Sequence, residues 1–238
     1  MKKLFLSLCM VLSCMVLKAQ LNASDIDLTS LGQGYSKVFD SNIPIPQKFS
    51  NAKQWIAKTF GDYKSVLQYE DEANAKIIIK GKCPLGSYYN ISEELLSDKD
   101  DVKMSFTLTL DFKEDRYRAK MEDLVAEIDN TFTVMFSPTY KHKTEPITTF
   151  CKNDDSKIDT LIEENNNELD TLQNRLSTEK LKKKEINLIN EDIKKLKDKN
   201  EILRNKKAVA FMHRYDTQRA ISQLLNSLYK DINTNDDF

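Results

Sequence analysis

Apolar residues recur along the chain with two spacings, and each spacing predicts a different element. Residues 103–112 alternate strictly between apolar and polar, which is typical of a half-buried strand. The apolar members of that strand are Met104, Phe106, Leu108, Leu110 and Phe112. Residues 48–60 instead place Phe49, Trp55, Ile56 and Phe60 at helical spacing, just before Gly61, so they predict an amphipathic helix.

Shorter apolar runs at residues 35–40, 64–69, 76–80 and 116–121 predict further strands. The polar stretch 81–101 predicts a loop. The element order is therefore strand, helix, then four strands joined in hairpins. This order favours an α+β fold, with an antiparallel sheet whose one face is covered by helices.

The chain after residue 146 contains neither glycine nor proline, which predicts helix to near its end. Two seams of apolar residues at steps of three and four, each with one asparagine, run over residues 158–176 and 186–203. Their phases do not match, so the region is either a helical hairpin or one long helix with a phase slip. Charge favours the hairpin, since residues 151–176 are net acidic and residues 177–207 net basic.

These patterns divide the chain into an α+β domain at residues 20–150 and a charged hairpin or coiled-coil insertion at 151–207. A C-terminal helix over 208–232 follows, with a stripe that includes Val209, Met212, Tyr215, Leu225 and Leu228. We expect this helix to pack on the sheet. The polar residues 233–238 should fray.

Residues 1–19 have a basic start, a short apolar run and Ala19 at a plausible cleavage point, the pattern of a secretory signal peptide. The apolar run is too short to span a bilayer, which takes about 20 residues. A lipid anchor at Cys14 is the less favoured alternative, because the residues after Cys14 stay apolar. We therefore predict an exported protein, either secreted or held in the periplasm or cell envelope.

Composition excludes several classes of function. The net charge of −1 falls to about −4 once Lys2, Lys3 and Lys18 leave with the signal peptide, so nucleic acid is not an expected partner. Only 2 histidines and 5 glycines are present, and no motif for a metal, a nucleotide or another cofactor stands out. Export permits a disulfide between Cys83 and Cys151, and the alternative is two separate buried thiols.

Four segments resemble one known family. Residues 55–60, 66–71, 76–81 and 113–118 are similar to those of an uncharacterised family of secreted bacterial proteins, described as a domain of unknown function with a TATA-binding-protein-like (TBP-like) fold. The resemblance covers about residues 35–125. It implies a curved antiparallel sheet with helices on one face, and it implies no activity.

The candidate ligand-binding residues are Lys113, Arg116 and Arg118, because Arg116 and Arg118 share one strand face and could hold an anion. The alternative is a solvated hairpin face. We expect no catalytic residues and no enzyme activity. The leading hypothesis is a binding or structural module of the cell envelope that contacts a protein partner, or itself, through the 151–207 helices. The alternative is an envelope enzyme or a small-anion-binding protein that uses Arg116 and Arg118, with Glu70 and Asp71 nearby.

Overall fold

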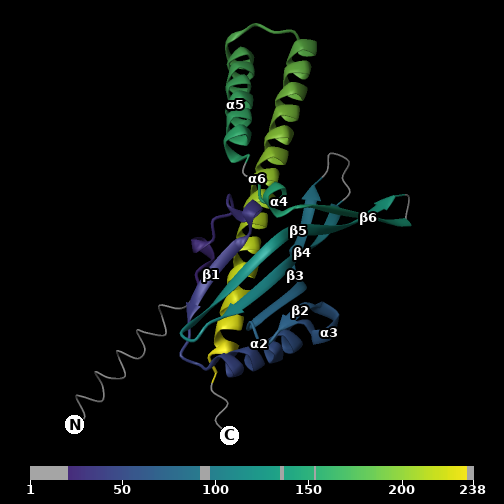
Figure 1. Cartoon of the computed structure of the whole chain (residues 1–238). Helices are drawn as coiled ribbons and strands as arrows, with labels where there is room; N and C mark the ends of the chain where they lie inside the picture. Colours follow the sequence, from purple (N-terminus) through teal and green to yellow (C-terminus); the bar gives the residue numbers. More distant parts are fainter. Residues whose placement is uncertain (1–20, 92–96, 135–136, 153, 235–238) are drawn as a thin grey trace, which may run out of the picture.

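The computed structural model describes residues 21–91, 97–134, 137–152 and 154–234 (Figure 1). The predicted signal peptide at 1–19, and Cys14 within it, lie outside the described residues. The strands are β1 (Tyr35–Asp40), β2 (Leu67–Asp71), β3 (Lys76–Ile91), β4 (Ser97–Phe112), β5 (Arg116–Val134) and β6 (Ser137–Pro146). The helices are η1 (Ala23–Asp25), η2 (Leu31–Gln33), α2 (Ile45–Phe60), α3 (Tyr63–Val66), α4 (Ile147–Phe150), α5 (Asp155–Thr178) and α6 (Lys183–Ile232).

The strands form one open antiparallel sheet in the order β1-β5-β4-β3-β2, and β6 pairs with the far half of β5. The α+β class and the antiparallel sheet are confirmed. The sheet has one strand more than predicted, since β6 is composed mainly of polar residues and has no apolar stripe. Such polar composition is typical of an edge strand. The exposed main-chain groups of an edge strand can pair with other chains, and polar side chains and proline disfavour that pairing.

The predicted loop at residues 81–101 is wrong. β3 continues to Ile91 and β4 begins at Ser97, so most of this stretch is a long hairpin. A register shift between Pro84 and Gly86 breaks the alternation of side chains, and this bulge hides the strand pattern in the sequence. The strand predicted at 64–69 also starts late, because residues 63–66 first form the helical turn α3.

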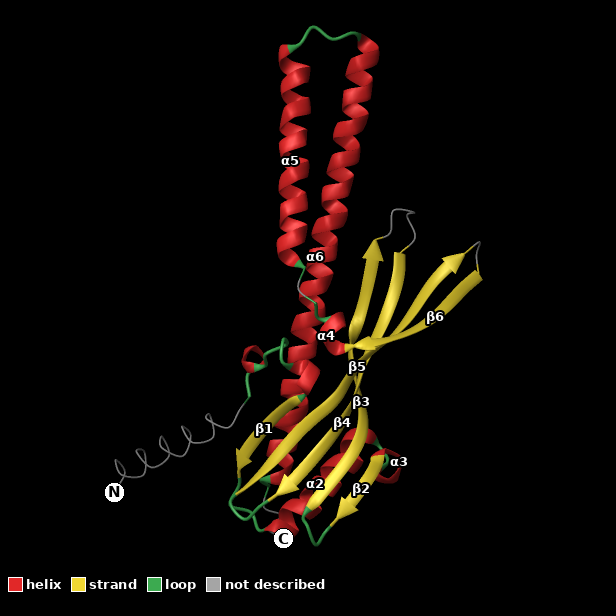
Figure 2. Cartoon of the chain, turned by 45° about the horizontal axis from the view of Figure 1, so that its top comes forward, coloured by secondary structure: helices red, strands yellow, loops and turns green. Residues whose placement is uncertain are grey.

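α2 and the C-terminal half of α6 cover one face of the sheet (Figure 2). The alternating apolar side chains of β4 are buried against these helices as predicted. On α6 the stripe is buried from Ile221 to Ile232, but Met212 and Tyr215 are 46% and 48% exposed. The predicted cover of the sheet by α6 is therefore correct only for its last part.

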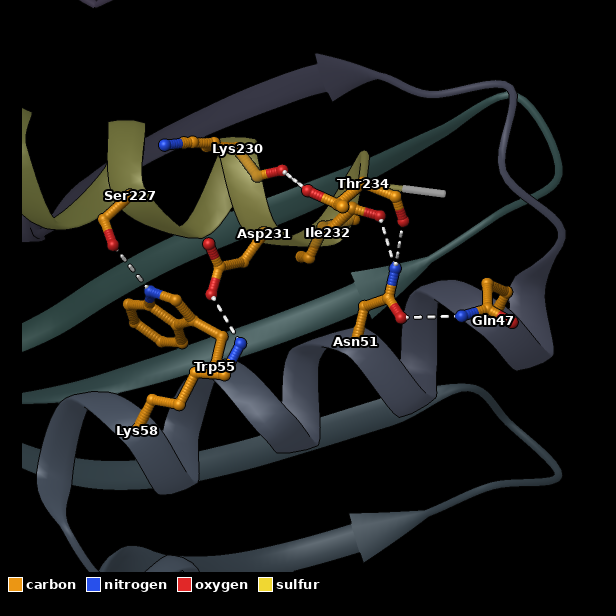
Figure 3. A network of polar contacts seen from close by, with 9 residues as sticks. All are labelled: Gln47, Asn51, Trp55, Lys58, Ser227, Lys230, Asp231, Ile232 and Thr234. Carbon is orange, nitrogen blue, oxygen red and sulfur yellow. Dashed lines mark hydrogen bonds and ion pairs between the residues drawn. The ribbon is translucent and has the colours of Figure 1, made fainter. Parts of the chain in front are cut away.

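Trp55 shows how α2 is held against α6 (Figure 3). Its ring is 1% exposed, and its indole Nε1 donates to Ser227 Oγ at 3.0 Å. One turn earlier, Asn51 Nδ2 donates to the main-chain oxygens of Ile232 and Thr234, both at 3.0 Å. Buried polar groups paired in this way fix the position of one helix on the other.

α5 and the first part of α6 run antiparallel as a helical hairpin that extends away from the sheet (Figures 1 and 2). The two helices are joined at residues 179–182. α6 continues without a break past residue 207, where a domain boundary was predicted. At about 1.5 Å per residue this 50-residue helix is about 75 Å long, and it links the hairpin rigidly to the sheet. Within the described parts of the chain, no helix is apolar over a sufficient length to cross a membrane.

Candidate functional site

The turn between β4 and β5 carries the three predicted ligand-binding residues, Lys113, Arg116 and Arg118. The main chain closes this turn, since the N–H of Lys113 donates to the oxygen of Arg116 at 2.9 Å. Lys48 of α2 adds a second anchor, because its ammonium donates to the oxygens of Lys113 and Glu114 at 2.5 and 2.8 Å. The turn therefore has a fixed shape despite its exposed position.

Strand register places a row of outward-facing residues beside Arg118. Val38 of β1 lies opposite Arg118 of β5, Arg118 opposite Asp111 of β4, and Asp111 opposite Lys76 of β3. Arg118 donates to Asp111 Oδ2 from Nη2 at 2.6 Å and from Nε at 3.1 Å. Lys76 Nζ lies 3.6 Å from the other oxygen, Oδ1. Asp111 thus orients the guanidinium of Arg118 across the sheet.

These residues surround a hollow of about 360 Å³ on the face of the sheet that the helices leave uncovered. We call it the Arg118 pocket, and it is lined by Val38, Asp111, Lys113, Arg116 and Arg118. Three of the five lining side chains are cationic and one is anionic. The structure therefore brings the three predicted residues together around one opening, an arrangement suited to holding an anion.

The carboxylates Glu70 and Asp71 lie elsewhere. They belong to β2, which is three strands away from β5, about 14 Å at the usual spacing between strands. Glu70 accepts from Lys53 Nζ and from Tyr63 Oη, each at 2.7 Å, and these contacts hold the pKa of its carboxyl below the usual range. Asp71 is engaged by Asn74 and Tyr69. The carboxylates and the guanidiniums are not one site.

Residues 36–127 match the model of a domain of unknown function with a TBP-like fold, DUF4468. This stretch is similar to the DUF4468 family over 92 of the 238 residues. The resemblance predicted from the sequence is confirmed, with nearly the bounds expected. The matched residues include nearly all of β1, then α2, β2 to β4 and the first part of β5, so all the residues that line the Arg118 pocket lie inside the matched stretch.

Two solved structures are similar to the chain. A DUF4468 family protein from Bacteroides ovatus is 17% identical, with 45% of this chain and 59% of that chain covered and a TM-score of 0.30. A TBP-like protein from Parabacteroides distasonis is 17% identical, with 51% of this chain and 69% of that chain covered and a TM-score of 0.32. The chain thus spans less than two thirds of the first of these proteins. No curated protein matches the chain.

The hairpin lies outside the DUF4468 match and has an apolar core of its own. Leu169, Ile189 and Ile193 are buried there, with Leu172, Leu176, Leu181 and Leu196 packed around them. The two asparagines of the seams meet in this core, where Asn165 Nδ2 donates to Asn200 Oδ1 at 2.7 Å. Nearer the sheet, Lys207 Nζ binds Asp159 at 2.6 Å. Some apolar side chains stay exposed, among them Leu161 at 41% and Leu188 at 53%.

Cys83 and Cys151 are free thiols in the structure, not a disulfide. Burial raises the pKa of Cys83 to about 12 and also raises the pKa of Cys151, so neither is poised as a nucleophile. Cys151 Sγ lies 3.3 Å from Thr217 Oγ1 on α6. Among the described residues, no group of three His, Cys, Asp or Glu side chains is arranged to hold a metal ion.

One cluster was not predicted from the sequence. The ring of His213 on α6 stacks on Phe150, with centroids 3.9 Å apart, and meets the edge of Tyr88 at 4.4 Å. Tyr88 Oη in turn donates to Asp216 Oδ2 at 3.0 Å. The cluster joins α4, α6 and the long β3 strand at the base of the hairpin. Only the pairing of β3 beyond residue 80, which the sequence pattern missed, brings Tyr88 to this place.

Proposed function

We propose that this chain is an exported, non-enzymatic binding or structural module of the bacterial cell envelope, and that the α5–α6 hairpin is its contact surface. The observation that carries the proposal is the separate core of the hairpin, which buries few apolar residues and leaves Leu161 and Leu188 exposed. Exposed apolar residues on a projecting helical arm favour contact with another helix or protein surface. The partner is another protein or a second copy of the chain.

Charge supports the same role. α5 is net acidic, whereas the part of α6 that lies beside it is net basic. A partner helix must therefore place basic residues beside α5 and acidic residues beside α6. The reverse orientation would bring like charges together and would be disfavoured. The distance between Glu70 and Asp71 on one side and Arg116 and Arg118 on the other supports a binding role over a catalytic one.

The test shortens the hairpin without removing its base. Residues 163–203 are replaced by a short Gly-Ser turn, so that Asp159 and Lys207 remain paired. Crosslinking in cells, pull-down and light scattering then compare this variant with the intact chain. We expect the variant to lose its crosslinked partner or its self-association, while the sheet domain keeps its melting temperature.

A point variant tests the same surface without removing the hairpin. Leu188→Lys places a charge on the exposed hairpin surface and leaves the core residues Leu169 and Ile193 in place. Its contacts should weaken in the same assays. An unchanged partner set and oligomeric state in both variants would show that the hairpin is not the contact surface.

Export is tested separately, on the protein isolated from the envelope fraction of its host. Mass spectrometry should find Gln20 as the first residue. A mature chain that starts at a lipidated Cys14 would replace the secreted form by a lipid-anchored one. Retention of residues 1–19 in the cytoplasm would contradict the envelope role.

A further inference from the structure

We propose that the Arg118 pocket binds a small carboxylate that carries an apolar group, such as a short fatty acid or an aryl acid. The site is independent of the hairpin, and its lining residues belong to strands β1, β4 and β5 and the β4–β5 turn, where Val38 is 51% exposed and its neighbour Phe39 is buried in the core. Its volume of about 360 Å³ is in the range of pockets that hold one small molecule. Three features argue for this ligand class.

The first feature is the supply of cationic nitrogens. Arg118 engages Asp111 through Nε and Nη2, so its Nη1 is left to donate to a ligand. Arg116 engages Asp115 through Nε alone, at 3.0 Å, so both of its terminal nitrogens are left to donate to a ligand. No described residue pairs with the ammonium of Lys113. A carboxylate in the pocket can therefore accept from two guanidinium groups and one ammonium without breaking an existing ion pair.

The second feature is that the Arg118 guanidinium and the main chain of the 113–116 turn are already held in place. Asp111 fixes Arg118, and Lys76 balances the charge of Asp111 from the next strand. Lys48 fixes the turn that carries Lys113. Because Arg118 and the main chain of the turn are ordered before the ligand arrives, binding costs less conformational entropy than it would on a surface made only of free side chains.

The third feature is Val38, an apolar side chain that is 51% exposed and lies opposite Arg118 in the strand register. It gives the pocket one apolar wall within a row of charged residues. A ligand with an alkyl or aryl group covers this wall, whereas inorganic phosphate does not. The ligand class therefore combines one carboxylate with one apolar group.

A second hollow on the same sheet face lacks this character. It measures about 380 Å³ and has two lysines, Lys80 and Lys82, and two carboxylates, Asp123 and Glu127. Lys82 is already bound to Glu127 at 2.7 Å. Its charges cancel, so an anion gains little there. The Arg118 pocket therefore differs from this second hollow in its excess of positive charge, which is not a general property of this sheet face.

The experiment follows amide shifts of the ¹⁵N-labelled mature chain during titration with hexanoate, 1-hexanol or inorganic phosphate at constant ionic strength. The pocket is exposed to solvent, so we expect a dissociation constant of about 1 mM for hexanoate, about 4 kcal/mol by the standard conversion. Shifts should concentrate on residues near Val38 and on the turn at 113–118. Hexanol and phosphate should each bind about fivefold more weakly or not at all.

Variants make the result specific. The double substitution Lys113→Gln and Arg116→Gln should weaken hexanoate at least fivefold, and Val38→Thr should weaken it about twofold. Arg175→Gln is the control, since Arg175 is an exposed, ion-paired arginine on the hairpin. The proposal is overturned by an absence of saturable shifts at 50 mM hexanoate, by equal binding of phosphate, or by unchanged binding in the double variant.

Discussion

The ammonium of Lys48 donates a hydrogen bond of 2.5 Å to the main-chain oxygen of Lys113, 65 residues away along the chain. The same ammonium reaches the oxygens of Glu114 at 2.8 Å and Ser41 at 3.4 Å, and the Lys48 side chain is fully buried. A helix residue thereby satisfies three carbonyls of two turns at one end of the sheet. The shape of the Arg118 pocket depends on this contact, because Lys113 lines the pocket.

Lys48→Met should lower the free energy of unfolding by about 2–4 kcal/mol, because the carbonyls lose a charged donor and stay partly buried. Urea unfolding measures this change. Lys58→Met is the matched control on the same helix, where the lysine side chain is 69% exposed, and it should change stability by less than about 1 kcal/mol. Equal effects of the two substitutions would contradict the anchoring role of Lys48.

The hydrogen bond between Trp55 and Ser227 supplies a second prediction. Ser227→Ala removes the acceptor at 3.0 Å and leaves the indole N–H buried, which should cost about 1–3 kcal/mol. Trp55 is the only tryptophan, so its fluorescence reports unfolding of the α2–α6 contact directly. Ser177→Ala, on the exposed end of α5, serves as the control. A stability within error of that control would show that the bond contributes nothing.

The parts of the fold that the sequence predicts are those with a regular apolar period. The alternation in β4 and the helical spacing around Trp55 both reflect one buried face, and both elements form where expected. The extension of β3 past residue 80 was missed because a bulge resets the side-chain period between Pro84 and Gly86. β6 was missed because a polar edge strand has no apolar face to detect.

The candidate site was predictable only in part. Alternation along a strand is enough to place Arg116 and Arg118 on the same face. Arg118 has Asp111 and Val38 as cross-strand neighbours, and only Asp111 orients its guanidinium. Both neighbours depend on the register of three strands, which the local sequence pattern does not determine. The sequence indicates only that Lys48 lies near the start of a helix. Its contact with Lys113 forms once the helix packs on the sheet, so it could not be predicted from local pattern.

The stability of the protein should depend on pH through His213. Burial between Phe150 and Tyr88 lowers the pKa of His213 below its usual value of about 6.5. The unfolded chain therefore binds a proton at a higher pH than the folded chain does. The contribution of His213 is fully present above about pH 6.5 and is lost as the pH falls through the folded pKa.

Unfolding free energies at pH 7.5 and pH 5.5 measure this loss. His213→Phe keeps an aromatic ring in the cluster without a titrating group, so its loss of stability between the two pH values should be smaller. His142→Gln is the control, because His142 is exposed on β6 and leaves the cluster intact. An identical pH dependence in the intact chain and in His213→Phe would refute the role of His213.

The contact between Asn165 and Asn200 should determine the register of the hairpin. Both side chains are buried, and Asn200 Nδ2 donates further to Asn166 Oδ1 at 2.9 Å. Asn200→Leu alone leaves Asn165 without its acceptor and should destabilise the hairpin by about 1–3 kcal/mol. Replacing both asparagines by leucine should instead stabilise the hairpin but allow the helices to shift, since a buried polar pair specifies register at a cost in stability.

Hydrogen exchange resolves the two effects, because the hairpin core is separate from the core under the sheet. The single variant should exchange faster in α5 and in α6 up to residue 207, with unchanged protection near Leu225 and Leu228. The double variant should gain protection in the hairpin, while crosslinks designed for the Asp159–Lys207 register should drop in yield. Asn167→Leu, at an exposed position on α5, should change neither quantity. Full crosslink yield in the double variant would show that the leucine seam alone fixes the register.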